Sequence, residues 1–337
     1  MDKSSSIELA AAAGPSEDDR APAAQRHSRR HWLGAALGAA ASAVTAEAAS
    51  LAGSWDHQHE SPLLAAAPSS PASPRPLAPR LTHIGHSCHL IEMGGQRWLT
   101  DPWFFDPAFG SLRHTAAQSV HSIGPLDGIF ISHRHADHFD PSALRALCKS
   151  AQVWTADPSL LEPLSELGFS EVHLSHPWLT SVSGALRVGF APAVHDVPQH
   201  SLVLVSDEAR VLFCADTGPH THWSEIRRRF RPSTALLPCD GTTLRWEPRQ
   251  IMNADEAARA AIDLGCRQLL QTHGDARYSD LVAEHLLSAS DREPLRALRA
   301  ALARGATGSR RQGGPQQPPV PEFTPLSIGE TRALLTS

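Results

Sequence analysis

The chain has 337 residues, of which 41% are hydrophobic, and a formal net charge of −5. This length suits one domain with a sizeable core, or one domain with tails. The negative charge argues against a nucleic-acid-binding protein, which is normally basic. The chain also holds 20 histidines, a high count that suits a metal-binding protein. The five cysteines show no framework spacing, so no disulfide scaffold is expected.

The first 48 residues resemble a twin-arginine export signal. Arg29 and Arg30 precede a short Ala-rich segment, and residues 46–48, Ala-Glu-Ala, offer a cleavage site. The apolar segment is too short to span a bilayer as a helix, so no transmembrane segment is expected. We therefore expect an exported, periplasmic protein. The alternative is a cytoplasmic protein with an Ala-rich tail and a chance arginine pair.

Residues 49–80 have the Ala, Pro and Ser composition of a linker, so the folded domain is expected to span residues 81–337. Strands are predicted at 81–84, 87–92 and 96–100, with a turn at Gly94-Gly95 between the last two. Residues 104–124 show no clear periodicity, which indicates a loop. A loop at this place would shape the choice of substrate.

The most informative segment runs from Ile131 to Pro141. It reads Ile-Ser-His-Arg-His-Ala-Asp-His-Phe-Asp-Pro and follows an apolar run of strand length, residues 126–131. Pro141 at the first position and Asp140 as N-cap predict a helix over 141–149. The loop holds four potential ligands for a borderline divalent ion such as Zn²⁺: His133, His135, Asp137 and His138. Alternate residues of an extended loop point the same way, so His133 and His135 can share one ion.

The segments that follow alternate between strand and helix, which indicates a layered α/β half. Strands are predicted at 151–155, 171–174, 185–190 and 201–205, and a helix at 158–167. Another apolar strand, 210–215, ends at Asp216. A buried carboxylate at a strand end needs a partner, which a position between two cations would supply. The alternative for Asp216 is a turn former or a helix cap.

The last third of the chain continues the same alternation. A helix over 221–230 carries Arg227, Arg228 and Arg229, which form either a solvated face or a basic patch for phosphate or anionic lipid. The other predicted elements are a strand at 235–238, a helix at 254–264 with Asn253 as cap and Gly265 as stop, a strand at 267–272 that delivers His273, a helix from 280 to 304, a flexible segment at 305–321 and an edge strand at 323–330.

The pattern His-x-His-x-Asp-His after a buried strand resembles the signature of the metallo-β-lactamase superfamily. The resemblance covers roughly Leu81 to Gly274. The block His-Ile-Gly-His-Ser-Cys-His-Leu-Ile-Glu, with Leu-Thr-Asp-Pro-Trp after it, resembles the branch that includes ascorbate-6-phosphate lactonases and N-acyl-phosphatidylethanolamine phospholipase D enzymes. The resemblance implies an α/β fold, an αββα sandwich in which two mixed sheets face each other between outer helices.

The resemblance also implies two divalent metal ions, with zinc as first choice and manganese or iron as alternatives. It favours His195, which follows a strand end, over His200. The first ion would take His133, His135 and His195, the second Asp137, His138 and His273, and Asp216 would bridge them. Asp137 and Asp216 are thus the carboxylates expected to take part in catalysis. Four further residues are candidates for the floor of the site, for orienting a ligand or for contact with substrate: His83, His86, Asp101 and His220.

The implied activity is hydrolysis of a phosphodiester or a lactone by a metal-bound hydroxide. The substrate would be a small or lipid-derived molecule. A redox protein with two irons in the same ligands is one alternative, and a metal-binding protein without catalysis is another.

Overall fold

The computed structural model describes residues 78–105, 107–109, 111–244, 249, 251–279, 288–290, 293–309 and 318–336. All of them belong to one compact unit, residues 70–337. The predicted export signal and residues 49–77 of the linker lie outside the described residues, so export and the position of a cleavage site stay predictions. Within the described part of the chain, no helix has the length and apolar character needed to cross a membrane.

Two mixed sheets of seven strands each form the centre of the domain. The first sheet has the strand order β18 (Thr331–Ala333), β1 (Arg80–Gly85), β2 (Cys88–Met93), β3 (Gln96–Thr100), β5 (Gly128–Ile131), β6 (Gln152–Thr155) and β7 (Val172–Leu174). The strands from β18 to β3 pair antiparallel, and those from β3 to β7 run parallel.

The second sheet has the strand order β17 (Glu322–Phe323), β14 (Gln268–Thr272), β12 (Thr234–Pro238), β11 (Arg210–Phe213), β10 (His200–Val205), β9 (Leu186–Pro192) and β8 (Thr180–Ser183). Here β8 to β11 pair antiparallel, whereas β11, β12, β14 and β17 run parallel. Two small ribbons pair β4 (Leu112–Arg113) with β15 (Arg277–Tyr278) and β13 (Thr243–Leu244) with β16 (Ser288–Ala289).

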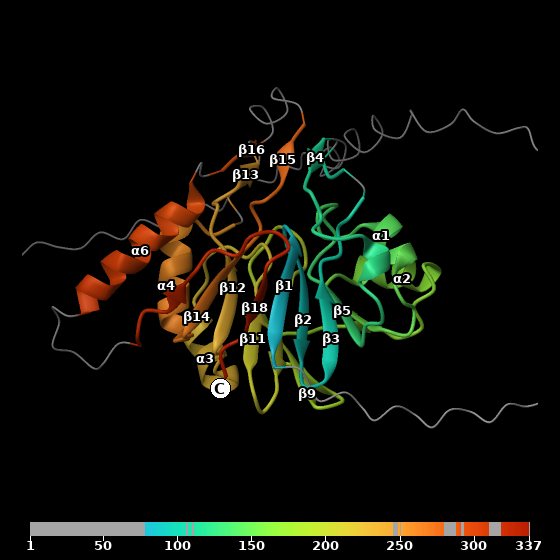
Figure 1. The fold of residues 1–337 in the computed structure, drawn as a ribbon, viewed down its shortest axis with the longest axis horizontal. Helices are drawn as coiled ribbons and strands as arrows, with labels where there is room; N and C mark the ends of the chain where they lie inside the picture. Colours follow the sequence, from blue (N-terminus) through green and yellow to red (C-terminus); the bar gives the residue numbers. More distant parts are fainter. Residues whose placement is uncertain are drawn as a thin grey trace, which may run out of the picture. The chain divides into compact units, whose positions relative to one another are not determined.

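Helices lie on the outer faces of both sheets, so the chain has the αββα sandwich that was predicted (Figure 1). The first sheet carries α1 (Pro141–Ala146), α2 (Leu161–Glu166) and the short 3₁₀ turns η1 (Val120–Ser122) and η2 (Pro158–Leu160); the second carries α3 (Trp223–Phe230), α4 (Ala254–Leu264) and α6 (Pro294–Ser309). Between the sheets, Phe130 stacks on Phe190 with ring centroids 6.0 Å apart and meets Phe213 edge-on at 6.3 Å.

Local signals set most helix ends where the sequence predicts them. Asp140 accepts a hydrogen bond from the N–H of Ala143 and starts α1 at Pro141. Asn253 and Glu256 form a reciprocal capping box at the start of α4, which ends at Gly265 with φ 64°. These caps satisfy backbone groups that a helix end would otherwise leave without partners, so they mark the boundaries from sequence alone.

Other boundaries differ from the predictions. The prediction of one edge strand over 323–330 was wrong. Strand β17 ends at Phe323, and Pro325, which follows, cannot donate a ladder hydrogen bond. The chain then crosses to the first sheet, where β18 pairs with β1. The helix α6 continues through Ser309, so the first residues of the segment expected to be flexible are helical. The helix expected from residue 280 was wrong in its first part, because Ser288–Ala289 form β16 and α6 begins at Pro294. Residues 280–287 of that expected helix and residues 310–317 of the expected flexible segment lie outside the described residues. Strand β8 was missed because its sequence, Thr-Ser-Val-Ser, has little apolar character.

Candidate metal centre

The candidate ligands follow the ends of strands from both sheets, along one edge of the sandwich. The loop after β5 carries the His133–His138 motif, and the turn between β1 and β2 carries His86. From the second sheet, β9, β11 and β14 lead into His195, Asp216 and His273. The carboxyl ends of parallel strands meet at one sheet edge, which is where α/β folds place their ligands.

One group consists of three imidazoles, His133, His135 and His195, as predicted for the first ion. Their facing ring nitrogens all lie within 4.8 Å of one another. Nδ1 of His135 is 3.0 Å from Nε2 of His133 and 3.2 Å from Nε2 of His195. Burial holds the pKa of His133 well below its usual value and lowers the pKa of His195 to about 4. Both rings are therefore neutral at pH 7, the form that binds a metal ion.

The second group contains Asp137, His138 and His273, and the structure adds His86 to it. Oδ2 of Asp137 is 3.2 Å from Nε2 of His86, 3.8 Å from Nε2 of His138 and 3.9 Å from Nε2 of His273. Burial lowers the pKa of His86 to about 4, so this ring is also neutral. His86 was expected only to line the floor of the site; here it offers a nitrogen to the same point as the predicted ligands.

Asp216 lies between the two groups. Its Oδ2 is 3.2 Å from Nε2 of His138 and 3.5 Å from Nε2 of His273. It also clusters with His133, a member of the first group, within the same 4.8 Å limit. This position suits a carboxylate that touches two ions at once, although the bridging role itself stays a prediction.

Two buried carboxylates, those of Asp101 and Asp240, contact the imidazole nitrogens that face away from the cluster. Oδ2 of Asp101 lies 2.8 Å from Nδ1 of His138, and Asp101 also accepts hydrogen bonds from the backbone N–H and the hydroxyl of Ser132. Asp240 lies 3.2 Å from Nδ1 of His273. Each contact occupies Nδ1 and leaves Nε2 facing the cluster, which is how carboxylates orient metal-binding histidines. Asp101 was predicted in this role, whereas Asp240 was missed.

The negative charge of the buried carboxylates indicates whether a cation fits in the cluster. Burial lowers the pKa of His273, but Asp216 and Asp240 outweigh it and raise that pKa to about 9. At His138, burial also lowers the pKa and nearby carboxylates raise it, with Asp216 as the largest of these. The carboxylates outweigh burial, so the pKa of His138 rises well above its usual value. Among the described residues, Oδ1 of Asp137, Oδ1 of Asp216 and Nε2 of His138 are buried without a hydrogen-bond partner. Buried carboxylate oxygens with unused lone pairs, beside imidazoles that bind a metal ion once they lose a proton, are a fitting donor set for divalent ions.

The backbone is strained at several of these residues. His86, Asp101, Ala215 and His273 have φ values of 54°, 36°, 47° and 64°, in the left-handed region that side chains with a Cβ rarely adopt. Each such residue costs on the order of 1–3 kcal/mol. The strained turns lie where a strand ends and a side chain must face the cluster, so the packed sheets hold the site in this conformation.

The other candidates lie outside the ligand groups. His83 has its Nε2 3.0 Å from Asp275 and 3.3 Å from the backbone oxygen of His86, so it contacts the chain beside a candidate ligand. The ring of His220 stacks on Trp223 with centroids 3.8 Å apart and is not brought to the cluster. His200, the alternative to His195, hydrogen-bonds Ser175 instead.

Comparison with known proteins agrees with this arrangement. Residues 96–274, more than half of the chain, match the model of the beta-lactamase superfamily domain. The chain belongs to the beta-lactamase superfamily. The matched range begins at β3 and ends one residue after His273, so it includes all seven predicted ligands and excludes His86.

Several members of the superfamily are similar to this chain. A metal-dependent hydrolase of Aeropyrum pernix is 28% identical over 48% of this chain and 71% of its own length. The N-acyl-phosphatidylethanolamine-hydrolyzing phospholipase D of Saccharomyces cerevisiae is 28% identical over 57% of this chain, which spans about half of that protein (46%). The crystal structure of an isothiocyanate hydrolase from Delia radicum gut bacteria covers 77% of this chain and 100% of its own, with 17% identity and a TM-score of 0.59, and it supports the fold.

Replacing Asp240 tests whether it positions His273. Asp240→Asn keeps the shape of the side chain and removes its charge, so we expect a 10- to 100-fold loss of metal affinity or activity, on the order of the usual effect of a carboxylate behind a metal-binding histidine. Asp263→Asn, on an exposed part of α4, is the matched control and should change neither. Metal titration and turnover of both variants would measure the difference, and equal values for the two would rule out a positioning role.

Proposed function

We propose that this protein is a hydrolase with two divalent metal ions, zinc by first choice, that cleaves a phosphodiester or a lactone. The observation that carries the proposal is the position of the Asp216 carboxylate between the two ligand groups. The names of the relatives support it: one is a metal-dependent hydrolase, and another hydrolyses a phosphodiester in a phospholipid. Iron or manganese would suit the same nitrogen and oxygen donors.

Two ions at this place would lower the pKa of a water molecule shared between them and polarise the oxygen of the bond to be cleaved. The residues of the chain supply the rest. The neutral rings of His133, His195 and His86 present lone pairs, and the outer carboxylates Asp101 and Asp240 keep their partners turned toward the centre. Oδ1 of Asp137 is buried without a hydrogen-bond partner, so this carboxylate has an oxygen free to contact a metal ion.

The rim of the centre suggests that the substrate has an apolar part. Phe109 and Val194 are 39% and 44% exposed; Phe109 lies in the loop after β3, and Val194 directly precedes His195. Phe109 meets the ring of His135 edge-on, with centroids 5.9 Å apart. Large exposed apolar side chains that lie together commonly mark binding sites. A substrate with an acyl or alkyl group next to the hydrolysed bond would cover them.

Truncating Phe109 should therefore weaken binding of substrates with long apolar groups more than of short ones. Burying half of a Phe side chain contributes about 1 kcal/mol, so we expect Phe109→Ala to raise KM about fivefold for a long-chain lactone or phosphodiester. Val182→Ala, on exposed β8, is the control, because Val182 is 77% exposed and belongs to the strand at the far edge of the second sheet. If Phe109→Ala leaves the ratio of KM values for long and short substrates as it is in the wild type and in Val182→Ala, there is no apolar subsite at Phe109.

Metal analysis and a substrate screen test the proposal as a whole. Protein purified without chelators should contain about two metal ions per chain and should hydrolyse members of a phosphodiester and lactone panel. Activity should disappear when a chelator removes the metal and return when zinc is added. Two irons with redox turnover and no hydrolysis would favour the diiron alternative, and bound metal with neither activity would favour a metal-binding protein.

A further inference from the structure

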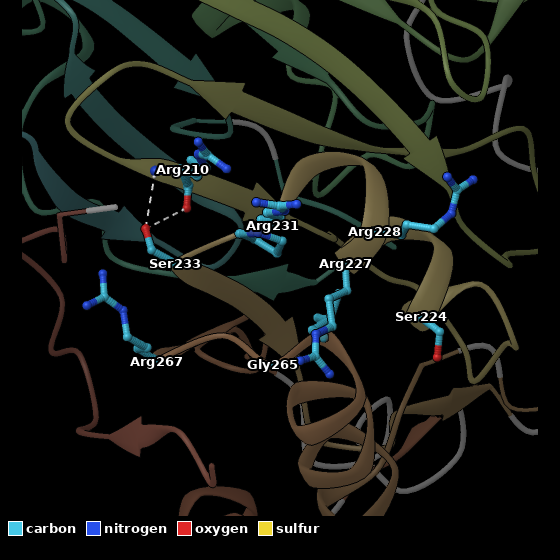
Figure 2. A pocket seen from close by; sticks show the side chains of 10 residues that line it. Arg210, Ser224, Arg227, Arg228, Arg231, Ser233, Gly265 and Arg267 are labelled. Carbon is cyan, nitrogen blue, oxygen red and sulfur yellow. Dashed lines mark hydrogen bonds between the residues drawn. The ribbon is translucent and has the colours of Figure 1, made fainter. Parts of the chain in front are cut away.

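A cavity of about 770 Å³ lies away from the metal centre and is lined mainly by arginines (Figure 2). Its cationic residues are Arg210, Arg227, Arg228, Arg231 and Arg267. None of the described residues that line it is acidic. Such a concentration of positive charge is notable in a chain whose formal net charge is −5. The volume is that of an ordinary ligand pocket.

The cavity and the metal centre lie at opposite ends of the same three parallel strands. Arg210 begins β11, and Ser233 and Arg267 immediately precede β12 and β14. The register of these strands pairs Val211 with Thr234 and Thr234 with Gln268, so the first residues of β11, β12 and β14 are neighbours at one edge of the sheet. The other ends of the strands lead to Asp216, Asp240 and His273. The five residues of β14 separate Arg267 from His273, so the two Cα atoms are six residue steps, or about 20 Å, apart.

Most of the arginines in the cavity have no carboxylate partner. Glu225 pairs with Arg228, but none of the described carboxylates forms an ion pair with Arg210, Arg227, Arg231 or Arg267. Nε of Arg210 is buried and lacks a hydrogen-bond partner among the described residues. The unpaired positive charge of these side chains therefore has no compensating carboxylate within the described part of the chain.

Helix ends account for only some of this charge. Arg227 and Arg228 lie in the last turn of α3, where basic side chains interact favourably with the helix dipole. Arg227 also lies over the end of α4, since a Cβ on Gly265 would be 3.0 Å from its Nε. Arg210 and Arg267 enter strands and have no such role. The parallel register places them along the same cavity as the arginines of α3; in Figure 2, Arg210 and Arg267 lie on one side and Arg227 and Arg228 on the other.

We propose that this cavity is a second binding site, for a ligand that carries two or more phosphate groups. Guanidinium groups bind phosphate oxygens through two parallel N–H donors, and several of them around one cavity can hold more than one phosphate. Each terminal phosphate carries nearly two negative charges at pH 7, so a di- or triphosphate would neutralise most of the lining. The ligand can be a soluble polyphosphate compound or the headgroup of a phosphorylated lipid, which share this chemistry.

Calorimetry with inorganic triphosphate tests the soluble source. The full-length, metal-loaded protein should bind it, and Arg210→Gln combined with Arg267→Gln should weaken the binding at least about tenfold, because charge-assisted hydrogen bonds are lost. Arg296→Gln combined with Arg299→Gln removes the same charge from the exposed face of α6 and should leave binding unchanged. Asp216→Asn should also retain the binding, which separates it from binding at the metal centre.

A second variant guards against a loss of folding. Arg231 has φ 50°, a conformation that Asn adopts readily, so Arg231→Asn should weaken binding without lowering thermal stability. Co-sedimentation with phosphatidylcholine vesicles, with and without about 5% phosphatidylinositol bisphosphate, tests the lipid source by the same recognition of phosphate. Binding to these vesicles but not to free triphosphate would identify a headgroup, and the reverse would identify a soluble ligand.

Four results would overturn the proposal. One is the absence of binding to both probes. Another is equal binding by the wild type and the Arg210/Arg267 variant. A third is a loss of binding in the α6 control as large as in that variant, because it would indicate a general effect of charge. Tighter binding of citrate than of triphosphate would contradict the assignment to phosphate. None of these results depends on hydrolysis, so the test stands apart from the proposed function.

Discussion

Asp216→Asn should abolish hydrolysis and lower the metal content of the protein. Asn keeps the shape of the side chain but loses the charge that faces both ligand groups. The Asp216 carboxylate lies 3.2 Å from Nε2 of His138 and 3.5 Å from Nε2 of His273, closer to both atoms than Asp137 does. The loss of activity should be at least on the order of 10²-fold, beyond the 10- to 100-fold effect typical of residues that only position a ligand. Metal stoichiometry and turnover would measure both effects.

Asp207→Asn is the control for this variant. Asp207 lies in an exposed turn between β10 and β11, in the same half of the fold as Asp216. The substitution makes the same chemical change outside the centre, so metal content and turnover should stay at wild-type values. If Asp216→Asn keeps two metals and near-normal turnover, Asp216 is a turn residue and does not bridge the two ions, so its assignment in the dinuclear site is wrong.

Metal binding at pH 7.5 should release about two protons. The pKa of His273 is raised to about 9 and that of His138 lies well above its usual value, so both rings are protonated before metal binds. Their Nε2 atoms must lose these protons to act as ligands. Apparent affinity should therefore rise with pH, by up to about two log units per pH unit while both rings are protonated, and less steeply once the pH passes about 9, the pKa of His273. Calorimetry in two buffers with different ionisation enthalpies would count the protons.

The metal-free protein should show the opposite dependence on pH. Because the folded-state pKa of His273 is raised, its contribution to stability is fully present below pH 6.5 and disappears as the pH rises through about 9. A shift of this size corresponds to about 3 kcal/mol. The melting temperature of chelator-treated protein should therefore fall as the pH rises from 6.5 to about 9. Asp240→Asn should reduce both the fall and the proton release, whereas an unchanged release would contradict the role of Asp240.

Local sequence was enough to predict the loop that carries four of the candidate ligands. His133 to His138 lie in one short segment, and the apolar run before it and the Asp140-Pro141 cap after it each indicate a boundary by themselves. The same holds for α4 and its capping box. His195, Asp216 and His273 were placed with the help of a family resemblance, and the structure brings all three to this loop.

Features that depend on the docking of distant segments were not predictable in this way. His86 follows β1, and only the meeting of the two sheets brings its ring within 4.1 Å of the ring of His273. Asp240 ends a buried strand as Asp216 does, and that shared position was the one signal that could have identified it. Likewise, Arg210 and Arg267 meet the arginines of α3 only because three strands run parallel in one register.

The pairing of β1 with β18 has a consequence for the synthesis of the protein. Thr82 and Thr331 hydrogen-bond across 249 positions of the chain, so one of the first strands to be made receives its outer neighbour among the last. At ~5–20 residues per second, this edge waits unpaired on the ribosome for roughly 12 to 50 seconds. An unpaired edge can capture a strand from another nascent chain. The interval before β18 emerges is therefore when this protein is most exposed to aggregation, and when a chaperone that covers the edge of β1 would help most.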